Sequence, residues 1–321
     1  MKAVVLAGGF ATRLWPITRH RAKMFLPVGE RAIVDYALAD LEADERVDEV
    51  FVSTNAEFAD AFREHLAESP FEKATLSVES PTAEDEKFGV VAALAELVER
   101  EGVEDDLLVV AGDNLVGTDL ADFTAFFAER GTTCLVAHDV GSREAARAYG
   151  PVRLDGDRVV ELQEKPENPA SSVTSIACYA FPAEVLDLLD EYLAAGNNPD
   201  EPGWFIQWLV DRRPVHAFRF DGPWFDVGEA DAYLDAVAWR LDGENLIADG
   251  ATVEGADLLG DVHVCAGATV RNATLERCVV FPDAVVEGAT LRNSIVDESA
   301  TVRGVDLDGA RIGQHSTVPG A

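Results

Sequence analysis

The first 29 residues contain no acidic side chain, although Asp and Glu make up 59 of the 321 residues and the formal net charge is -33. The same stretch carries five basic residues, Lys2, Arg13, Arg19, Arg21 and Lys23. Residues 6–16 (LAGGFATRLWP) supply Gly8 and Gly9, whose backbone N–H groups can point into one concavity, and such a nest binds phosphate. We therefore expect this segment to bind an anion, the alternative being an ordinary glycine turn beside surface arginines.

The spacing of the glycines narrows the kind of phosphate site. The loop is neither GxxxxGK[ST] nor GxGxxG, so neither a P-loop nor a dinucleotide site is supported. Arg19 and Arg21 are expected to raise the local positive potential.

The composition outside this stretch excludes several function classes. The acidic surface makes general nucleic-acid binding improbable and, with five lysines against 21 arginines, predicts a halophilic protein that needs salt to screen its own charge. The four cysteines form no CxxC pair, so we expect buried thiols and neither a zinc site nor a disulfide framework. Because no apolar run reaches the length of a membrane span or a signal-peptide core, a cytoplasmic protein is expected.

The elements that must position the basic loop alternate between strand and helix. An apolar run at residues 2–7 leads into the two glycines and predicts a buried strand that ends in a tight turn. Further strands are expected at residues 49–53, 75–78, 107–111 and 133–137, and helices at 33–42, 57–67, 90–100 and 120–129. This order predicts a Rossmann-like, doubly wound α/β domain with a mostly parallel (mixed) sheet. After residue 149, strands are expected at 151–154, 158–163 and 175–181, and a helix at 183–195.

From about residue 257 the chain repeats every 16 residues. The four segments are DLLGDVHVCAGATVRN, ATLERCVVFPDAVVEG, ATLRNSIVDESATVRG and VDLDGARIGQHSTVPG. Aliphatic residues line up in three rows: Leu259, Leu275, Leu291 and Leu307; Val264, Val280, Val296 and Ile312; and Val270, Val286, Val302 and Val318. Three inward-facing rows predict a three-sided parallel β-helix of hexapeptide-like repeats.

This repeat predicts two domains, one at residues 1–240 and a β-helix at 241–321. The chain stops directly after the last coil, and an exposed end of stacked strands favours association. We therefore expect a homo-oligomer formed through the β-helix.

Four motifs, in order, resemble one enzyme family. LAGGxxTRL followed by KMFLPVG is similar to the LAGGxGTRLxPxTxxxPKxLLPV pattern of the sugar-1-phosphate nucleotidyltransferases, with Ala11 at a usual glycine and Ala22 at a common proline. The sequences AGDN at 111–114, EKP at 164–166 and WFDVG at 224–228 resemble the family's GDN, EKP and WxDxG. The resemblance covers residues 6–228 and is to glucose-1-phosphate thymidylyl- and uridylyltransferases with a C-terminal left-handed β-helix. Each motif also has a plainer interpretation: Asp113 could cap a turn, Lys165 could be solvated, and Asp226 could start a helix near Glu229.

The resemblance implies a reaction and a role for each matched residue. A sugar-1-phosphate oxygen would attack the α-phosphorus of a nucleoside triphosphate, and pyrophosphate would leave with the help of Mg²⁺. Asp113 and Asp226 would hold the metal. The implied nucleotide-binding residues are Leu6, Ala7, Gly8, Gly9, Arg13, Lys23, Gly89 and Asp113, of which Arg13, Lys23 and Asp113 are catalytic. The sugar phosphate would be bound by Gly150, Glu164 and Lys165.

The nucleobase and the sugar are less determined. In the family the base lies against the Gly8 loop and a second loop, here residues 79–89 (ESPTAEDEKFG), which ends in Gly89. The acidity of this loop fits base recognition or a halophilic surface equally well. The resemblance favours dTTP or UTP, with glucose-1-phosphate.

Two other function classes remain open. Acyl transfer in the β-helix would need a histidine base, and the repeats contain only His263 and His315, with no inserted loop that could form a cofactor cleft. A non-catalytic, nucleotide-sugar-binding regulatory subunit is favoured by Ala11 in the glycine loop but disfavoured by the retained carboxylates and lysines.

Overall fold

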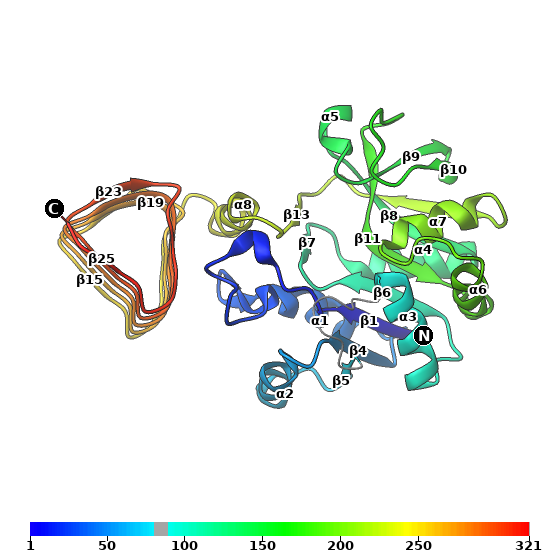
Figure 1. Cartoon of the computed structure of the whole chain (residues 1–321), viewed down its shortest axis with the longest axis horizontal. Coiled ribbons are helices and arrows are strands. Elements are labelled where there is room, and N and C mark those ends of the chain that lie inside the picture. The colour runs from blue at the N-terminus through cyan, green and yellow to red at the C-terminus, as the bar shows by residue number, and fades with distance from the viewer. Residues whose placement is uncertain (80–88, 321) are drawn as a thin grey trace. The chain divides into compact units, whose positions relative to one another are not determined.

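The computed structural model describes residues 1–79 and 89–320. The chain divides into two compact units (Figure 1). Unit 1 comprises Met1–Gly8 and Tyr36–Trp224, and unit 2 comprises Gly9–Asp35 and Phe225–Ala321.

Unit 1 is built on a nine-stranded mixed sheet. Its strands are β1 (Lys2–Leu6), β4 (Glu49–Thr54), β5 (Ala74–Val78), β6 (Leu107–Ala111), β8 (Thr133–Asp139), β9 (Gly150–Asp155), β10 (Arg158–Leu162), β11 (Val173–Phe181) and β12 (Val215–Arg219), in the order β5-β4-β1-β6-β11-β8-β12-β10-β9. The strands β5, β4, β1 and β6 run parallel, whereas β11 lies antiparallel between β6 and β8. The expected α/β architecture is therefore confirmed, with a sheet that is mixed.

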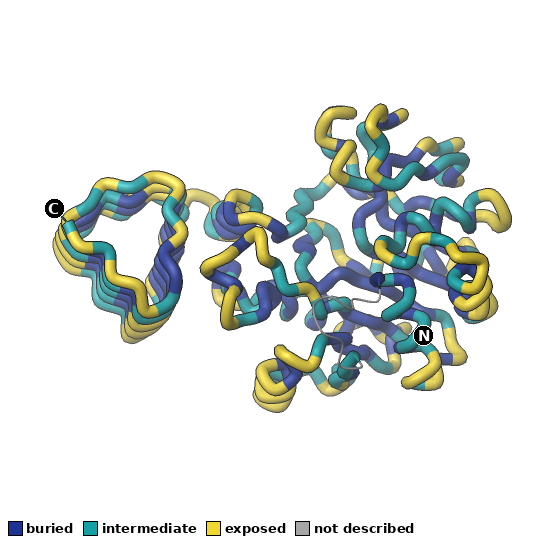
Figure 2. Tube along the Cα trace, viewed as in Figure 1, coloured by how far each residue is buried: buried dark blue, intermediate teal, exposed yellow. Residues whose placement is uncertain are grey.

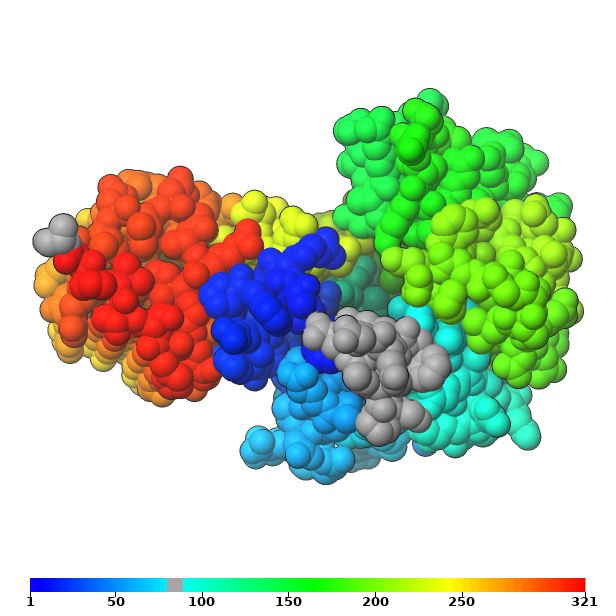
Figure 3. Space-filling view, in the orientation of Figure 1, coloured from blue at the N-terminus to red at the C-terminus, as the bar shows by residue number. Residues whose placement is uncertain are grey.

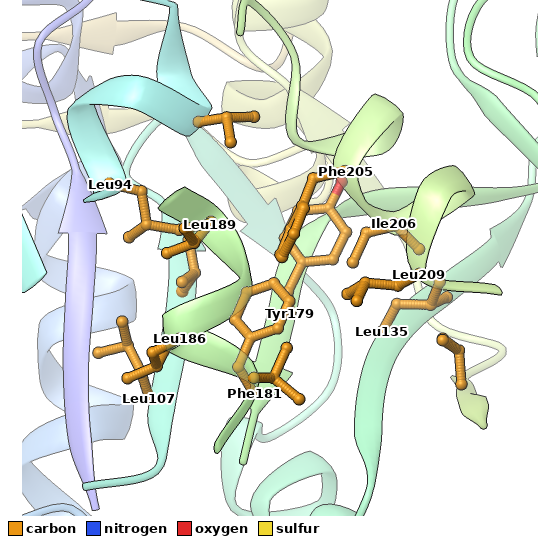
Figure 4. Close-up of a cluster of buried hydrophobic side chains, with 14 of the residues drawn as sticks. Leu94, Leu107, Leu135, Tyr179, Phe181, Leu186, Leu189, Phe205, Ile206 and Leu209 are labelled. Atoms are coloured by element: carbon orange, nitrogen blue, oxygen red, sulfur yellow. The ribbon is translucent and has the colours of Figure 1, made fainter. Parts of the chain in front are cut away.

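The register of these strands explains where the core lies. Val4 pairs with Phe51 on one side and Val109 on the other, and Tyr179 pairs with both Val109 and Leu135. Because alternate residues of a strand share a face, this row forms one apolar surface. The surface packs against α3 (Val90–Glu101), α6 (Ala183–Ala194) and α7 (Pro202–Val210). Figure 4 shows this cluster.

The helix α4 (Leu120–Arg130) covers the opposite face of the sheet. Its Phe123 ring lies 6.0 Å from the ring of Phe218, which follows Ala217 in β12. Because Ala217 belongs to the apolar cluster on the first face and successive strand residues point to opposite faces, Phe218 lies on the other face. The remaining helices that begin or lie in this unit are α2 (Ala59–Glu68), α5 (Arg143–Ala146) and most of α1 (Ile33–Ala43). The boundary between the units falls within α1. A short strand, β7 (Asn114–Val116), follows β6.

Unit 2 contains a stack of parallel strands that we call the C-terminal coil, residues 246–318. Its strands are β14 (Leu246–Ile247), β15 (Thr252–Glu254), β16 (Asp257–Leu258), β17 (His263–Val264), β18 (Thr269–Arg271), β19 (Thr274–Val280), β20 (Val285–Glu287), β21 (Thr290–Val296), β22 (Thr301–Arg303), β23 (Asp306–Asp308), β24 (Arg311–Ile312) and β25 (Thr317–Val318). The coil has a three-sided outline (Figure 1), and exposed positions recur at the same places in successive turns (Figure 2).

The 16-residue period appears directly in the strand pairing. Val270 pairs with Val286, which pairs with Val302, which pairs with Val318. The first three of these side chains are fully buried in one apolar cluster inside the coil. Stacked apolar rows of this kind stabilise such repeats, because each coil covers its neighbour.

One expected row is wrong at its first position. Leu258 pairs with Leu275, whereas Leu259 is 59% exposed. Leu258 and its partner Leu275 are 17 residues apart in sequence, whereas His263 and its partner Val279 are 16 apart. One extra residue therefore lies between Leu258 and His263 in this turn of the coil. Gly260, with φ +117°, accommodates the insertion in a conformation that other residues rarely adopt.

The rest of unit 2 consists of residues 9–35 and one long helix. The first segment contains the short 3₁₀ helices η1 (Thr12–Leu14) and η2 (Lys23–Phe25) and the hairpin strands β2 (Pro27–Val28) and β3 (Arg31–Ala32). The strand β13 (Trp224–Asp226) crosses the boundary between the units and precedes α8 (Ala230–Leu241). The buried Tyr233 of α8 donates a hydrogen bond to the Pro27 carbonyl at 2.8 Å, which anchors the segment to the helix.

The cysteines have the environment that their spacing predicts, since all four are buried and unpaired. Among residues 1–79 and 89–320, no helix is long and apolar enough to cross a membrane.

Candidate active site

The glycine loop begins at the carboxyl end of β1, a central strand of unit 1. The Gly8 carbonyl accepts a hydrogen bond from Asn55 Nδ2 at 2.8 Å, and the Ala7 carbonyl accepts one from Thr54 Oγ1 at 3.2 Å. A Cβ atom at Gly8 would lie 2.8 Å from Glu79 Oε1, so a side chain at this position would collide with the Glu79 carboxyl group. Leu6, Ala7 and Gly8 are therefore held in one backbone conformation at the strand end.

The loop continues in unit 2 through Ala11, whose backbone is left-handed. Ala11 has φ 49° and ψ 45°, a conformation that glycine adopts far more readily than alanine. Its carbonyl accepts hydrogen bonds from Leu14 N–H at 2.9 Å and from Thr18 Oγ1 at 2.8 Å. The turn thus accounts for a family preference for glycine here, and these hydrogen bonds hold the same turn with alanine.

Arg13 lies beside the WFDVG motif. Its side chain is 68% exposed and forms an ion pair with Glu229, with Nη1 3.2 Å from Oε1. A Cβ atom at Gly228 would lie 2.9 Å from Arg13 Nη2, so this glycine leaves room for the guanidinium group. Unit 2 therefore brings Arg13 close to the motif that contains Asp226. Lys23, at the start of η2, is largely buried, with 9% of its surface exposed.

Asp226 does not serve as the cap of the helix that follows it. The helix α8 begins at Ala230, and its N-cap residue is Glu229. The plainer interpretation of Asp226 as a helix start is therefore wrong.

Asp113 follows β6, the parallel neighbour of β1. The Gly112 N–H donates to the Leu6 carbonyl at 2.9 Å, which joins the GDN motif to the start of the glycine loop. Asn114 Nδ2 donates to Asp113 Oδ1 at 2.9 Å, and Trp224 Nε1 donates to Asn114 Oδ1 at 2.6 Å. Trp224 thus orients Asn114, and Asn114 orients the Asp113 carboxyl group.

An aromatic cluster in unit 1 fixes Trp224 in turn. Its ring lies 4.9 Å from that of Tyr149 and 5.9 Å from that of His138. Burial lowers the pKa of His138, so a neutral imidazole is favoured beside the indole. The motif matches alone gave no role to Asn114, Trp224 or Tyr149.

Glu164 lies at the centre of a second cluster in unit 1. A Cβ atom at Gly150 would lie 3.1 Å from Glu164 Oε2, so the carboxyl group contacts this backbone. The Glu164 N–H donates to Gln207 Oε1 at 3.2 Å. Burial, followed by repulsion from Glu201, raises the pKa of Glu164 to about 7, and Lys165 opposes this shift.

Lys165 is held by its backbone and by its side chain. It has φ 44°, and its N–H donates to the Tyr149 carbonyl at 3.0 Å. Its ammonium group forms an ion pair with Glu201, the N-cap residue of α7. Lys165 is therefore not an unconstrained surface lysine, and its left-handed backbone is of the kind that clusters at functional sites.

The start of α7 is the part of this cluster that the sequence analysis missed. It supplies Glu201, Gly203 and Gln207. Pro202 in the first turn is a usual helix-start signal and could have identified this helix.

Gly89 is the N-cap residue of α3 and has a packing role. A Cβ atom here would lie 2.1 Å from the Pro199 carbonyl oxygen, so only glycine permits this approach. The Val90 and Val91 N–H groups donate to the carbonyls of Asp200 and Pro199, at 3.0 and 2.9 Å. Residues 80–88, the rest of the expected base-recognition loop, lie outside the described residues.

The candidate residues thus form groups within each unit. Asp113 belongs to unit 1, as do the three sugar-phosphate candidates Gly150, Glu164 and Lys165. Arg13, Lys23 and Asp226 belong to unit 2. Within the described ranges, no three His, Cys, Asp or Glu side chains gather as metal ligands.

Comparison with known proteins identifies the family. A family model described as nucleotidyl transferase matches residues 2–242. The glucose-1-phosphate thymidylyltransferase of Streptomyces griseus is 30% identical over 85% of this chain and 75% of its own length. The bifunctional protein GlmU of Methanocaldococcus jannaschii is 26% identical over 84% of this chain and 61% of its own length. This chain thus spans less than two thirds of some curated relatives that it matches, including a Sulfolobus acidocaldarius protein.

A solved structure supports the same fold. It is from Bacillus anthracis, is named as a glucose-1-phosphate thymidylyltransferase in complex with a sucrose, and is 23% identical. It superposes with a TM-score of 0.65 over 75% of this chain and 95% of its own. The region matched by the family model contains the glycine loop and the GDN, EKP and WFDVG motifs. The chain belongs to the nucleotidyl transferase family.

Proposed function

We propose that the protein joins a nucleoside triphosphate to a sugar-1-phosphate, giving a nucleoside-diphosphate sugar and pyrophosphate. The observation that carries this proposal is the hydrogen-bonded series Trp224–Asn114–Asp113, which links two family motifs more than 100 residues apart in sequence. An interaction of this kind fixes a carboxylate in one orientation, as a metal ligand requires.

The reaction needs positioning more than proton transfer. An oxygen of the sugar phosphate forms a bond to the α-phosphorus, and the bond from that phosphorus to the bridging oxygen of pyrophosphate breaks. The leaving oxygen takes the electron pair. Because the attacking oxygen is already anionic at neutral pH, no general base is required. Arg13 and Lys23 would neutralise the triphosphate, which allows two anions to approach.

The sugar phosphate would bind at the Glu164 cluster. Lys165 would exchange its ion pair with Glu201 for the phosphate group, and Glu164 would accept hydrogen bonds from sugar hydroxyls. Gly150 has no side chain to block the approach of a sugar ring to the backbone.

Asp113 and Asp226 suit Mg²⁺ in kind, because this hard cation prefers a few carboxylate oxygens together with phosphate oxygens. A bound Mg²⁺ would stabilise the charge that develops on the phosphates. The Asn114 amide donates to Asp113 Oδ1 and so holds this carboxylate in one orientation, which suits a metal ligand.

The substrates proposed are dTTP or UTP and glucose-1-phosphate. The S. griseus relative, named as a glucose-1-phosphate thymidylyltransferase, supports this choice. A relative from Synechocystis, named as a UTP–glucose-1-phosphate uridylyltransferase, is 26% identical over 76% of this chain.

The proposed architecture is a catalytic domain at residues 1–240 and a left-handed parallel β-helix at 241–321. The β-helix would also form the contact of a homo-oligomer. Exposed apolar side chains on its first turn, Ile247 at 47% and Leu259 at 59%, support association there. Light scattering in molar KCl should give a mass above that of the monomer, and a monomeric mass contradicts this part.

The alternative functions are less well supported. For acyl transfer, His263 is only 4% exposed, and burial lowers its pKa to about 4, so it is poorly placed as a base for a bound substrate. For a non-catalytic binding protein, Ala11 was the main support, yet it holds the loop conformation without glycine.

Pyrophosphate release over a panel of triphosphates and sugar-1-phosphates, measured in molar KCl with Mg²⁺, tests the proposal. Turnover with one pair well above the others is expected. Binding of nucleotide sugar without release from any pair would favour the regulatory subunit instead.

A further inference from the structure

Arg21 is fixed to the C-terminal coil, within unit 2. Its Nη2 atom lies 2.8 Å from Asp297 Oδ1 and 3.2 Å from Glu298 Oε2. Its guanidinium carbon lies 4.7 Å from the centre of the Phe281 ring. Phe281, Asp297 and Glu298, from two successive turns of the coil, therefore hold the Arg21 side chain of the N-terminal segment, residues 9–35.

The environment of this contact is unlike that of a surface ion pair. The Asp297 side chain is 2% exposed and that of Arg21 is 19% exposed. Burial raises the pKa of Asp297, and Arg21 is the largest of the interactions that oppose this shift. The sequence interpretation of Arg21 as a general source of positive potential is therefore wrong, because Asp297 and Glu298 of the coil neutralise its charge.

Two further contacts join the same segment to the last turns of the coil. Arg311 Nη1 donates to the Arg13 carbonyl at 3.2 Å. A Cβ atom at Gly313 would lie 2.8 Å from Pro16 Cβ, so the coil backbone packs closely on the proline. Figure 3 shows the N-terminal segment (blue) against the last turns (red).

The positions of these contacts matter because each lies next to a proposed catalytic cation. Arg21 is two residues before Lys23, and the Arg13 carbonyl belongs to the other catalytic cation. The coil thus holds this backbone at Arg13 and again two residues before Lys23. Arg19, two residues earlier, is exposed and lies over the Trp15 ring at 5.9 Å, so it offers a matched arginine that does not contact the coil in this way.

We infer that Arg21 is a positioning residue for the triphosphate and that the C-terminal coil takes part in turnover through its ion pair with Asp297. This inference rests on the proposed function. Arg21 does not itself touch the substrate; it holds Arg13 and Lys23 where the triphosphate binds. Small displacements of such groups have large effects, because charge stabilisation depends on geometry.

The test compares Arg21→Gln with Arg19→Gln in the full-length protein. Arg21→Gln should raise the KM for the triphosphate and lower kcat/KM for it by roughly 10- to 100-fold, with the KM for the sugar-1-phosphate unchanged. Arg19→Gln should stay within about twofold of the wild type, since it changes one exposed charge. Arg21→Lys should recover part of the loss, because it restores one charge without the planar fork.

A double variant separates positioning from stability. Arg21→Gln leaves Asp297 buried without its cation, so the melting temperature should fall. Arg21→Ala with Asp297→Asn removes that buried charge and should return the melting temperature toward the wild type, while the KM for the triphosphate stays raised. If the kinetics recover together with the melting temperature, Arg21 is structural only and the inference is wrong.

Hydrogen exchange tests the anchoring of the N-terminal segment separately from the proposed reaction. Amides of residues 11–27 should exchange faster in Arg21→Gln than in Arg19→Gln, whether or not the protein turns over. No turnover by the wild type, with this difference present, would overturn the proposed reaction and leave the anchoring intact. Equal exchange in the two variants would overturn the anchoring.

Discussion

The carboxyl group of Glu164 occupies the space that a side chain at Gly203 would need. A Cβ atom at Gly203 would lie 1.7 Å from Glu164 Oε2, closer than any non-bonded contact. The first turn of α7 therefore encloses Glu164, which explains why its pKa rises to about 7. If Glu164 binds the sugar phosphate as proposed, a pKa of about 7 would make that binding sensitive to pH.

The KM for the sugar-1-phosphate should fall as pH rises through about 7, because ionised Glu164 accepts stronger, charge-assisted hydrogen bonds from sugar hydroxyls at both of its oxygens. Kinetics between pH 6 and 8.5 measure this. Glu164→Gln should raise that KM by about tenfold at pH 8 and remove the dependence. A wild-type profile that matches the Gln variant would exclude Glu164 from the sugar site.

The same group predicts a stability difference of known sign. The pKa of Glu164 is higher in the folded protein than its ordinary value of 4.5, so the folded state binds this proton more tightly. Its contribution is complete below pH 4.5 and is lost as pH rises to about 7. The melting temperature of Glu164→Gln relative to the wild type should therefore be higher at pH 8 than at pH 5.

Ala11→Gly should stabilise the protein by about 1 kcal/mol, because glycine adopts the left-handed conformation of this turn without the Cβ clash. Ala22→Gly is the control, since Ala22 has φ -63° and ψ 138° and is buried. It should destabilise by a similar amount. Denaturant unfolding in molar KCl measures both, and destabilisation by Ala11→Gly would contradict the assigned turn.

His263→Val should improve stability at mildly acidic pH. His263 Nδ1 is buried without a hydrogen-bond partner, and Val279 occupies the paired position on the next turn. Since burial lowers the pKa of His263 from 6.5 to about 4, stability is complete above pH 6.5 and is lost as pH falls toward 4. The variant should gain about 1 kcal/mol at pH 5 in chemical unfolding and less at pH 8. An unchanged pH profile would show that His263 does not titrate in this window.

Asp113→Asn and Asp226→Asn should each lower kcat by roughly 100-fold or more, or about 2.7 kcal/mol, because under the proposed function each would remove a charged ligand of Mg²⁺. The half-saturating Mg²⁺ concentration should rise in both. Asp249→Asn, at an exposed turn, is the control and should leave both quantities unchanged. Turnover that persists in either site variant would refute its metal assignment.

Salt should stabilise the protein strongly, because a formal net charge of -33 repels itself in dilute buffer. The melting temperature should rise by about 10 °C between dilute buffer and 2 M KCl, which corresponds to ~7 kcal/mol when the whole chain unfolds together. Neutral sucrose of equal osmolality is the control. A melt that is insensitive to KCl would refute the halophilic interpretation.

The sequence was sufficient wherever apolar runs were long and continuous. The expected strand at 107–111 coincides with β6, and the expected helix at 90–100 differs from α3 by one residue. Buried strands and amphipathic helices of this length have few competing interpretations. The antiparallel position of β11 was less accessible, because strand order depends on contacts far apart in sequence.

The sequence predicted which residues belong to the candidate site but not the side chains that hold them in place. Asp113 was identified by its motif, whereas its orientation by Asn114 and Trp224 depends on a contact across 110 residues. The prediction that Leu259 faces inward was wrong because a single extra residue shifts the register, which an alignment in steps of 16 residues does not reveal. Arg21 was read as a surface charge because nothing local distinguishes it from Arg19.

The anchoring of Arg21 also restricts how the coil can change in evolution. Each added turn would move every later residue by about 4.8 Å, one strand spacing. A turn inserted before Phe281 would therefore carry Asp297 away from the 2.8 Å contact with Arg21, while a turn added after Val318 would disturb nothing that Arg21 touches. Homologues that keep this ion pair should thus share the number of turns up to Asp297 and vary in length only beyond it.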